Sequence, residues 1–465
     1  MKFLFPGLSL LLLLSGCFSG PLSAPTPDPL PIEWRNAGNF RSASPDRDLG
    51  RWWNSFEDPT LTRIIREGLS SSPDVASAAA RVREARANRK ATAAALFPTL
   101  DASAGSNTRY TKIQGLAGNS DTTYSAGLDA SWQADLFGRN RNQALAAATD
   151  AKAAEENLNS VRASLAAEIA IAYTSLRTSE ARLDVLQRNI ATQQETWQIA
   201  DWRKQAGEAD ALEAGQAETS LEQAKAAIPQ VRQAIEQTRN LLARLCGREP
   251  GALDATLRRT SVKLPDPGRQ LAIGIPADTL RQRPDVRAAS WQVLSAAARN
   301  RAARAERFPS LNLSGSLGIN ALSAGKLFDP NTFTAGIISG ISGPIFDAGR
   351  IQANIEASDA AIERALLDYR SSILTALSEV EDALIACRRS SERLATLEKA
   401  TRLARETDRL ARQRYEAGEI DFLSILETQR TLLALEDNLL ATRSDRATAF
   451  IRLYQALGGG WSAGS

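Results

Sequence analysis

The pattern of apolar positions changes its period several times along the chain and predicts both helices and strands. Two long segments carry apolar residues at steps of three and four or multiples of them, the spacing of one helix face. The first includes Leu158, Leu165, Leu176, Leu183 and Ile190, and the second includes Ile355, Ile362, Ile373, Val380 and Leu384. A helix of about 65 residues extends ~100 Å. Each segment is therefore expected to pack along neighbouring helices, as in a coiled coil, and not around a globular core.

Between the helical segments apolar residues alternate with polar ones, which is the period of a β-strand. The clearest alternation places on one side Tyr124, Ala126, Leu128, Ala130, Trp132, Ala134 and Leu136. Strands are expected at about 99–111, 122–137, 310–320 and 333–346. Long strands with one apolar face and aromatic residues near their ends are typical of an outer-membrane β-barrel with a polar interior. The same alternation would also fit a half-buried antiparallel sheet in a soluble protein.

The number of strands limits how such a barrel can form. A bacterial outer-membrane barrel needs at least about eight strands, and an open sheet edge in lipid leaves backbone groups without hydrogen-bond partners. Two copies of a four-stranded chain would make a barrel too narrow for an open channel, whereas three copies would supply twelve strands. The expected fold class is a mixed α and β membrane protein whose trimer forms a 12-stranded outer-membrane β-barrel with four strands per chain.

The chain also contains an internal two-fold sequence duplication. The segment RKQAGEADAL at Arg203–Leu212 returns 211 positions later as RYEAGEIDFL at Arg414–Leu423. In each copy a glycine that can end a helix, Gly207 or Gly418, is followed three positions later by an Asp that can cap the next helix. Each copy is therefore expected to form the turn of a helical hairpin.

The duplication and the changes of period divide the chain into six segments. They are a signal peptide over 1–16, an N-terminal tether segment over 17–57, a first structural repeat over 58–247 with its hairpin tip near 207, an inter-repeat linker over 248–276, a second repeat over 277–458 with its tip near 418, and a C-terminal tail over 459–465. Pro229 lies in the returning helix of the first hairpin and is expected to kink or break it.

The amino terminus has the features of a bacterial lipoprotein. Met1-Lys2 precedes an apolar run that is too short to span a bilayer, which is typical of a cleaved signal peptide. The sequence Leu14-Ser15-Gly16-Cys17 resembles a lipobox, after which Cys17 becomes the lipidated first residue; the alternative is a chance cysteine. Phe18 at the next position implies sorting to the outer membrane. No cofactor other than this covalent lipid is expected.

Composition narrows the chemistry that the chain can perform. The 465 residues include no His, and 56 Lys and Arg against 53 Asp and Glu give a net charge of +3. The absence of His disfavours a His-based acid/base site and most zinc sites, and no basic block interleaved with aromatic residues suggests nucleic-acid binding. We therefore expect neither an enzyme nor a metal site. Cys246 and Cys387 are expected to be buried thiols in helix packing, with a disulfide as the alternative.

Three segments are distinctive: residues 275–288, read IPADTLRQRPDVRA, residues 456–461, read ALGGGW, and the opening Trp52-Trp53 with Phe56, Asp58, Pro59 and Leu61. In these segments the chain resembles outer-membrane efflux lipoproteins of the TolC and OprM type, the outer-membrane factors of RND efflux systems, in their NodT-like subfamily. The resemblance implies a homotrimer whose barrel in the outer membrane is continued by a long periplasmic α-helical barrel. It also implies an equatorial collar built from the termini, including the segment 17–57, and from the inter-repeat linker 248–276. It implies as partners a periplasmic adaptor, an inner-membrane RND-type pump and outer-membrane lipid.

The resemblance also assigns roles to residues near the two turns. In related channels the positions of Leu423, Glu427 and Arg430 line the periplasmic constriction, so these three residues are expected to form the gate. They share one helix face, and threefold symmetry would turn each position into a ring. The alternative is an ordinary exposed ion pair between Glu427 and Arg430. The equivalent positions of the first hairpin carry no charge.

The tips of the two hairpins are expected to dock the adaptor through Gly207, Glu208, Gly418 and Glu419. The implied function is a passive exit duct that carries small toxic compounds or drugs to the exterior. Two alternatives stay open: a duct of the same architecture for type I protein secretion or metal export, and a non-conducting structural lipoprotein. The sequence identifies neither the transported substrate nor the individual pump and adaptor.

Overall fold

The computed structural model describes residues 33–36, 49–112, 114–115, 118–258, 264–266 and 280–460. Cys17, the expected signal peptide and Trp461 lie outside these residues. The chain forms two compact units. The first contains Arg81–Glu155 and Ala288–Arg370 with the whole sheet, and the second contains Pro27–Ala80, Glu156–Arg287 and Ser371–Ser465 with both hairpin tips.

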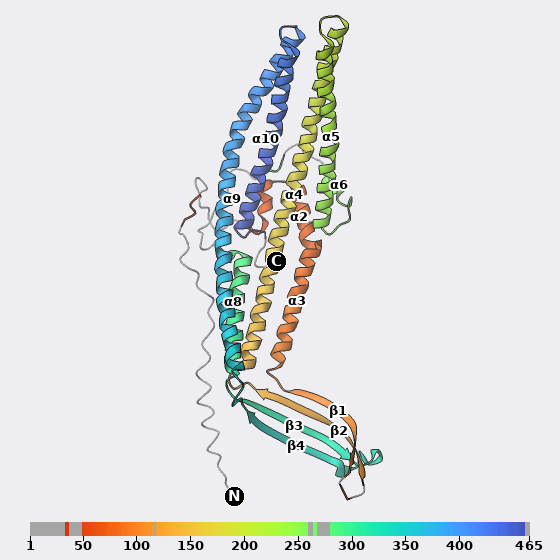
Figure 1. Ribbon diagram of the computed structural model, residues 1–465, viewed down its shortest axis with the longest axis vertical. Helices are drawn as coiled ribbons and strands as arrows, with labels where there is room; N and C mark the ends of the chain where they lie inside the picture. The colour runs from red at the N-terminus through yellow and green to blue at the C-terminus, as the bar shows by residue number, and fades with distance from the viewer. Residues whose placement is uncertain are drawn as a thin grey trace. The chain divides into compact units, whose positions relative to one another are not determined.

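The first unit contains a four-stranded antiparallel sheet with the strand order β1-β2-β3-β4 (Figure 1). Its strands are β1 Thr99–Thr111, β2 Asn119–Ala134, β3 Ser310–Ala321 and β4 Phe333–Ser342. Neighbours in sequence are neighbours in the sheet, so β1 and β4 are its two edges. Among the described residues, no further strand pairs with either edge.

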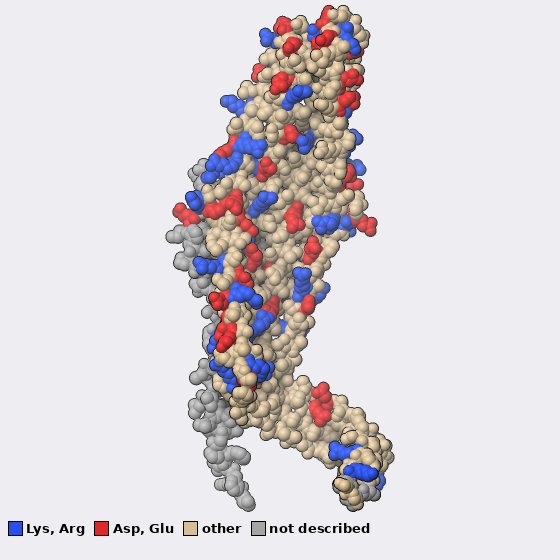
Figure 2. Space-filling view, in the orientation of Figure 1, with Lys and Arg blue, Asp and Glu red and all other residues tan. Residues whose placement is uncertain are grey.

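The pairing register places most apolar residues of the four strands on one face, with Ile338 of β4 as an exception on the other. One row across the sheet contains Ala102, Leu128, Leu317 and Ala335, and the next row contains Asp101, Asp129, Ser316 and Gly336. Leu128 and Leu317 are 43% and 49% exposed in the single chain. The surface of the sheet seen in Figure 2 is largely uncharged, whereas acidic and basic side chains are interspersed along the helices.

Two strands have other ends than the alternation predicts. β2 covers 119–134 instead of 122–137, because pairing with β1 continues to Asn119 and because the Asp135 carboxylate accepts the backbone N–H groups of Asn140 and Arg141 at 3.1 and 2.8 Å. These two bonds cap the following helix. β4 ends at Ser342 instead of 346, since Gly343 and Pro344 follow and proline has no N–H to donate.

The helices occur in pairs whose members begin 211 positions apart. They are α3 Pro73–Ala94 and α8 Pro284–Ala305, α4 Arg139–Gln205 and α9 Arg350–Glu416, and α5 Ala211–Leu245 and α10 Phe422–Ala456. Shorter elements are η1 Leu49–Phe56, α2 Pro59–Ser71, α6 Asp254–Leu257, η2 Ala324–Lys326 and η3 Pro330–Thr332. Among the described helices, none has an apolar stretch of the length and low charge that crossing a membrane requires.

Pro229 does not break α5, which runs without interruption from Ala211 to Leu245. A proline removes one N–H and the hydrogen bond to the carbonyl four residues earlier. The remaining turns of this 35-residue helix are held by buried side chains on both sides of the proline, including Leu221 and Val231. The expected break of the helix at this position is therefore wrong, whereas the alternative of a kink stays a prediction.

The core of the second unit surrounds η1 and the end of α10. The Trp52 ring stacks on Tyr454 with centroids 5.4 Å apart, and the Gly460 N–H donates to the Leu49 carbonyl at 2.9 Å. A side chain at Gly459 would meet backbone oxygens at 2.8 and 2.9 Å, so only glycine fits. These contacts join the segment around Trp52 to the glycines Gly459 and Gly460 that follow α10. Cys246 and Cys387 are buried and not bonded to each other, as predicted.

Candidate functional site: the hairpin tips

Both hairpin turns end their first helix with the same backbone arrangement. The Glu208 N–H donates to the Arg203 carbonyl and the Glu419 N–H to the Arg414 carbonyl, each at 2.8 Å. Gly207 and Gly418 have φ of +79° and +73°, and a side chain at either would meet nothing within 4 Å. The left-handed backbone, and not lack of space, therefore requires glycine at both turns.

Each second helix begins at an aspartate cap. Asp210 accepts the Glu213 N–H at 2.8 Å, and Asp421 accepts the Ser424 N–H at 2.9 Å. The turns predicted from the repeated segment are therefore confirmed as hairpin turns. Gly207, Glu208, Gly418 and Glu419 are all exposed, the steric condition that docking of a partner requires.

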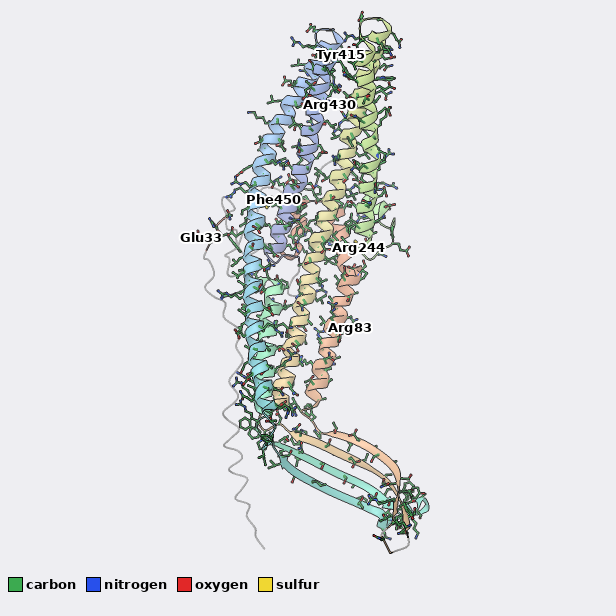
Figure 3. All side chains as sticks on the ribbon, viewed as in Figure 1. Glu33, Arg83, Arg244, Tyr415, Arg430 and Phe450 are labelled. Carbon is green, nitrogen blue, oxygen red and sulfur yellow. The ribbon has the colours of Figure 1, made fainter. Side chains whose placement is uncertain are left out.

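Three residues join the two hairpins just behind the tips, and we call them the tip junction: Arg203, Glu213 and Tyr415. The Tyr415 hydroxyl on α9 donates to Oε1 of Glu213 on α5 at 2.5 Å. Nη1 of Arg203 on α4 lies 3.7 Å from the same oxygen, and its guanidinium lies 5.2 Å from the centre of the Tyr415 ring. Tyr415 is labelled near the hairpin tips in Figure 3. Three helices from both hairpins thus meet at one carboxylate.

The environment of Tyr415 keeps its hydroxyl protonated. Burial, and after it the hydrogen bond to the Glu213 carboxylate, raises the pKa of Tyr415 well above its ordinary value. The hydroxyl is therefore a hydrogen-bond donor throughout the physiological pH range. The pattern of apolar positions gave no sign of this junction. One sequence feature could have pointed to the junction. Tyr415, whose side chain carries a hydroxyl, stands in the second copy at the position where the first copy has Lys204.

An apolar cluster lies beside the tip junction and contains residues of all four long helices. Its buried members are Ala200, Ala217, Tyr415, Phe422, Ile425 and Leu426. The Tyr415 and Phe422 rings meet edge to face with centroids 6.2 Å apart. Because the cluster takes residues from both hairpins, the tips of one chain are packed together by apolar burial as well as by the polar junction.

The three predicted gate residues lie on the exposed face of α10. Leu423 is 59% exposed, and Glu427 and Arg430 are also exposed, whereas Phe422 and Ile425 of the same turns are buried. Arg430 is labelled in Figure 3. In the part of the chain that the structure describes, no salt bridge joins Glu427 to Arg430, so the ordinary ion pair is not formed. The helix face that these three residues share is therefore exposed to solvent in the single chain.

The corresponding face of the first hairpin differs in charge. Leu212 is 65% exposed and matches Leu423, but Gln216 and Thr219 stand where the second hairpin has Glu427 and Arg430. Of these matching positions, only those of the second hairpin are therefore charged. Metal binding is a separate matter. Among the residues that the structure describes, no group of three or more Asp, Glu, His or Cys side chains could hold a metal ion.

A family model and individual relatives are similar to this chain over most of its length. The family model described as outer membrane efflux protein matches residues 64–248 and again 275–459, two segments whose starts are 211 positions apart. The toluene efflux pump outer membrane protein TtgF of Pseudomonas putida is 31% identical over 99% of this chain and 98% of its own length. The pyoverdine export outer membrane protein OpmQ of Pseudomonas aeruginosa is 31% identical over 98% of this chain and 96% of its own.

Solved structures agree with the sequence comparison. The outer-membrane channel OprN superposes on this chain with a TM-score of 0.89 at 31% identity. The superposition covers 96% of this chain and 100% of the OprN chain. The open state of the Neisseria gonorrhoeae channel MtrE gives a TM-score of 0.83 at 29% identity, with 96% and 99% covered. The role of such proteins is transport and not catalysis. The chain belongs to the outer membrane efflux protein family, and its function is that of an efflux channel in the outer membrane.

Proposed function

We propose that three copies of the chain form one exit duct, with a 12-stranded β-barrel in the outer membrane and an α-helical barrel in the periplasm. The observation that carries this proposal is the four-stranded sheet with two unpaired edges. In a sheet of four antiparallel strands β1 and β4 run in opposite directions, so β4 of one copy can pair antiparallel with β1 of the next. Three copies close the ring and leave no edge exposed to lipid.

The two faces of the sheet fit the two surfaces of such a barrel. The face with Leu128 and Leu317 would meet lipid, and the face with Asp129 and Ser316 would line a water-filled interior. The matching bounds of the helix pairs and the double match to the family model support an origin of the two halves by duplication. Each copy then contributes two hairpins to a ring of helices.

The duct is proposed to work with an inner-membrane RND-type pump and a periplasmic adaptor, which docks at Gly207, Glu208, Gly418 and Glu419. Transport through the duct itself is passive. TtgF is named for toluene and OpmQ for pyoverdine, which supports small organic compounds as the cargo of this chain. Cys17 is proposed to carry the lipid that anchors the mature chain to the outer membrane.

The gate is proposed to consist of Leu423, Glu427 and Arg430, repeated around the threefold axis. Their position on the exposed face of α10, opposite its buried residues, supports this assignment. Three Glu427 carboxylates in a narrow pore would attract cations and repel one another, and Arg430 would offset part of that charge. The tip junction is proposed to hold the two hairpins of each copy together while the gate is closed.

The test is the conductance of the purified protein in a planar lipid bilayer. Wild-type protein is expected to form channels, and the double variant Glu427→Ala with Arg430→Ala is expected to conduct more per channel because the narrowest ring loses its side chains. The matched control is Glu398→Ala with Arg443→Ala, an exposed pair on the same hairpin at 3.1 Å, which should leave conductance unchanged. Equal conductance of the gate variant and the wild type would remove these residues from the gate.

Two further measurements separate the alternatives. A protein that inserts and never conducts would be the structural lipoprotein. For the cargo, a strain lacking the gene is tested against antibiotics, dyes, solvents and metals, and for secretion of proteins into the medium. Restored resistance to organic compounds by the wild-type chain supports the proposed cargo, whereas restoration of metal resistance or of protein secretion alone would replace it.

A further inference from the structure

A short N-terminal segment is bound to the middle of α9 by one glutamate. We call residues 33–36 the N-terminal strap; Glu33, its first residue, is labelled beside α9 in Figure 3. Oε1 of Glu381 accepts the Arg35 N–H at 2.7 Å, and Oε2 accepts the Asn36 N–H at 3.1 Å and the Asn36 side-chain N–H at 2.7 Å. The contact joins residues 345 and 346 positions apart.

Two further observations support a specific attachment of the strap: the burial of Trp34 and a second contact of Asn36 with α9. Trp34 is only 7% exposed, although residues on both sides of it in the strap are exposed or half-buried. Arg388, seven positions after Glu381 on α9, donates to the Asn36 side-chain oxygen at 3.5 Å. Asn36 thus contacts two charged residues that lie two turns apart on one helix face.

The chemistry of the acceptor makes Glu381 specific for this role. A carboxylate has only acceptor sites, and here both oxygens accept from N–H donors of the strap. Hydrogen bonds to an ionised acceptor are about twice as strong as those between neutral groups. A glutamine of the same size would keep one acceptor oxygen and would turn an N–H₂ group toward a backbone N–H, so one strap donor would lose its partner.

We propose that Glu381 is the receptor of the N-terminal strap and fixes the point at which the anchored end of the chain joins the helices. The consequence for the membrane rests on the lipid at Cys17. The 16 positions from Cys17 to Glu33 span at most ~55 Å when fully extended. The strap therefore limits how far the Glu381 level of α9 can lie from the membrane surface.

Release of the strap would lengthen the tether considerably. The next described residue with a tertiary hydrogen bond is Leu49, whose carbonyl accepts the Gly460 N–H at 2.9 Å. From Cys17 to Leu49 there are 32 positions, so the reach of the tether would double to ~110 Å. A bound strap thus shortens the part of the tether between the lipid at Cys17 and its first contact with the helices.

The experiment is hydrogen–deuterium exchange of the purified full-length protein in detergent, read on peptides that contain residues 33–36. Glu381→Gln is expected to speed exchange of the Arg35 and Asn36 amides about tenfold, because they exchange only when the strap opens. Glu381→Asp should restore part of the protection. Glu363→Gln, an exposed glutamate elsewhere on α9, is the matched control and should leave strap exchange unchanged.

Unchanged exchange in Glu381→Gln, or the same increase in Glu363→Gln, would overturn the proposal. Should Glu381→Gln fail to assemble, Asn36→Ala serves instead, since it removes the side-chain bonds to Glu381 and Arg388 and should speed exchange by a smaller factor; no change there would also overturn it. Cys17→Ser separates this proposal from the lipid anchor. Loss of lipid with preserved strap protection is expected, whereas protection lost together with the lipid would contradict a receptor role of Glu381.

Discussion

The hydroxyl of Tyr415 lies 2.5 Å from Oε1 of Glu213, although the two residues are 202 positions apart. Tyr415 lies in the last turn of α9, the long helix of the second hairpin, and Glu213 lies in the first turn of α5, the returning helix of the first. The Arg203 guanidinium lies 3.7 Å from the same carboxylate oxygen. The two tips of one chain are therefore tied together at the level where the turns begin, and movement of one hairpin past the other must break this contact.

Tyr415→Phe tests whether this contact restrains the mouth of the channel. The variant keeps the ring and its contact with Phe422 but loses the hydrogen bond to a carboxylate, a change of about 1.5–3 kcal/mol. We expect larger or more frequent openings in planar bilayers. The control is Tyr173→Phe, which removes a 2.8 Å bond to Asp58 away from the tips and should leave conductance unchanged. Identical openings in Tyr415→Phe and wild type would contradict a restraining role.

Docking of the adaptor at the tips predicts a defined crosslinking pattern. A photoreactive amino acid at Glu208 or Glu419, both exposed, should capture a periplasmic adaptor in cells. The same group at exposed positions on the sheet, such as Ile337, should capture none. The products are identified by mass spectrometry after purification. Adaptor captured from the sheet and not from the tips would place the docking surface elsewhere.

Lipidation at Cys17 predicts incorporation of fatty acid. Cells that express the wild-type chain and are fed radioactive palmitate should yield a labelled band, and Cys17→Ser should abolish the label because serine cannot form the thioether. Cys246→Ser is the matched control and should retain it, since this cysteine is buried and burial raises its pKa to about 11. Retained label in Cys17→Ser would refute the lipoprotein assignment.

Arg283 predicts a stability effect that depends on pH. Its buried guanidinium binds Asp285 and Glu379 at 2.7 Å and the Ala456 carbonyl at 2.9 Å. Arg283→Met should lower stability by about 1–3 kcal/mol, less than a fully buried pair, because both carboxylates are partly exposed. The shift in thermal midpoint measures it. Arg299→Met, which breaks the more exposed pair with Asp150, should shift the midpoint much less.

The pH dependence of the Arg283 contact has a definite sign. Burial alone would raise the pKa of Asp285, but the hydrogen bond and the charge of Arg283 outweigh it and hold that pKa below its usual range. A carboxyl with a lowered pKa stabilises the fold above its unfolded value and loses that contribution as the pH falls through the lowered one. The difference between wild type and Arg283→Met should therefore shrink below about pH 4. A difference that stays constant down to pH 2 would show that Asp285 is not involved.

Local patterns predicted much of the fold because their causes are local. The Gly207 and Gly418 turns, with an aspartate cap three positions later, follow from left-handed glycine and from capping, which depend on a few consecutive residues. The strands follow from alternation, which determines the two faces of a sheet wherever it is built. Strand ends were predicted less well, since the end of β2 depends on Asp135 capping α4 and that of β4 on Gly343 and Pro344.

The sequence by itself determined that the chain has two matching hairpins and four long strands. It also determined that Glu427 and Arg430 after the second turn are charged, whereas the matching residues after the first turn are not. Which side chains meet between these elements was decided by the tertiary structure. Glu213 and Glu381 look like ordinary solvated helix residues in the sequence, yet one accepts a bond from Tyr415 and the other binds the N-terminal strap. Contacts across 202 and 346 positions leave no periodic trace, because they depend on which helix faces lie side by side after packing and not on the spacing within either helix.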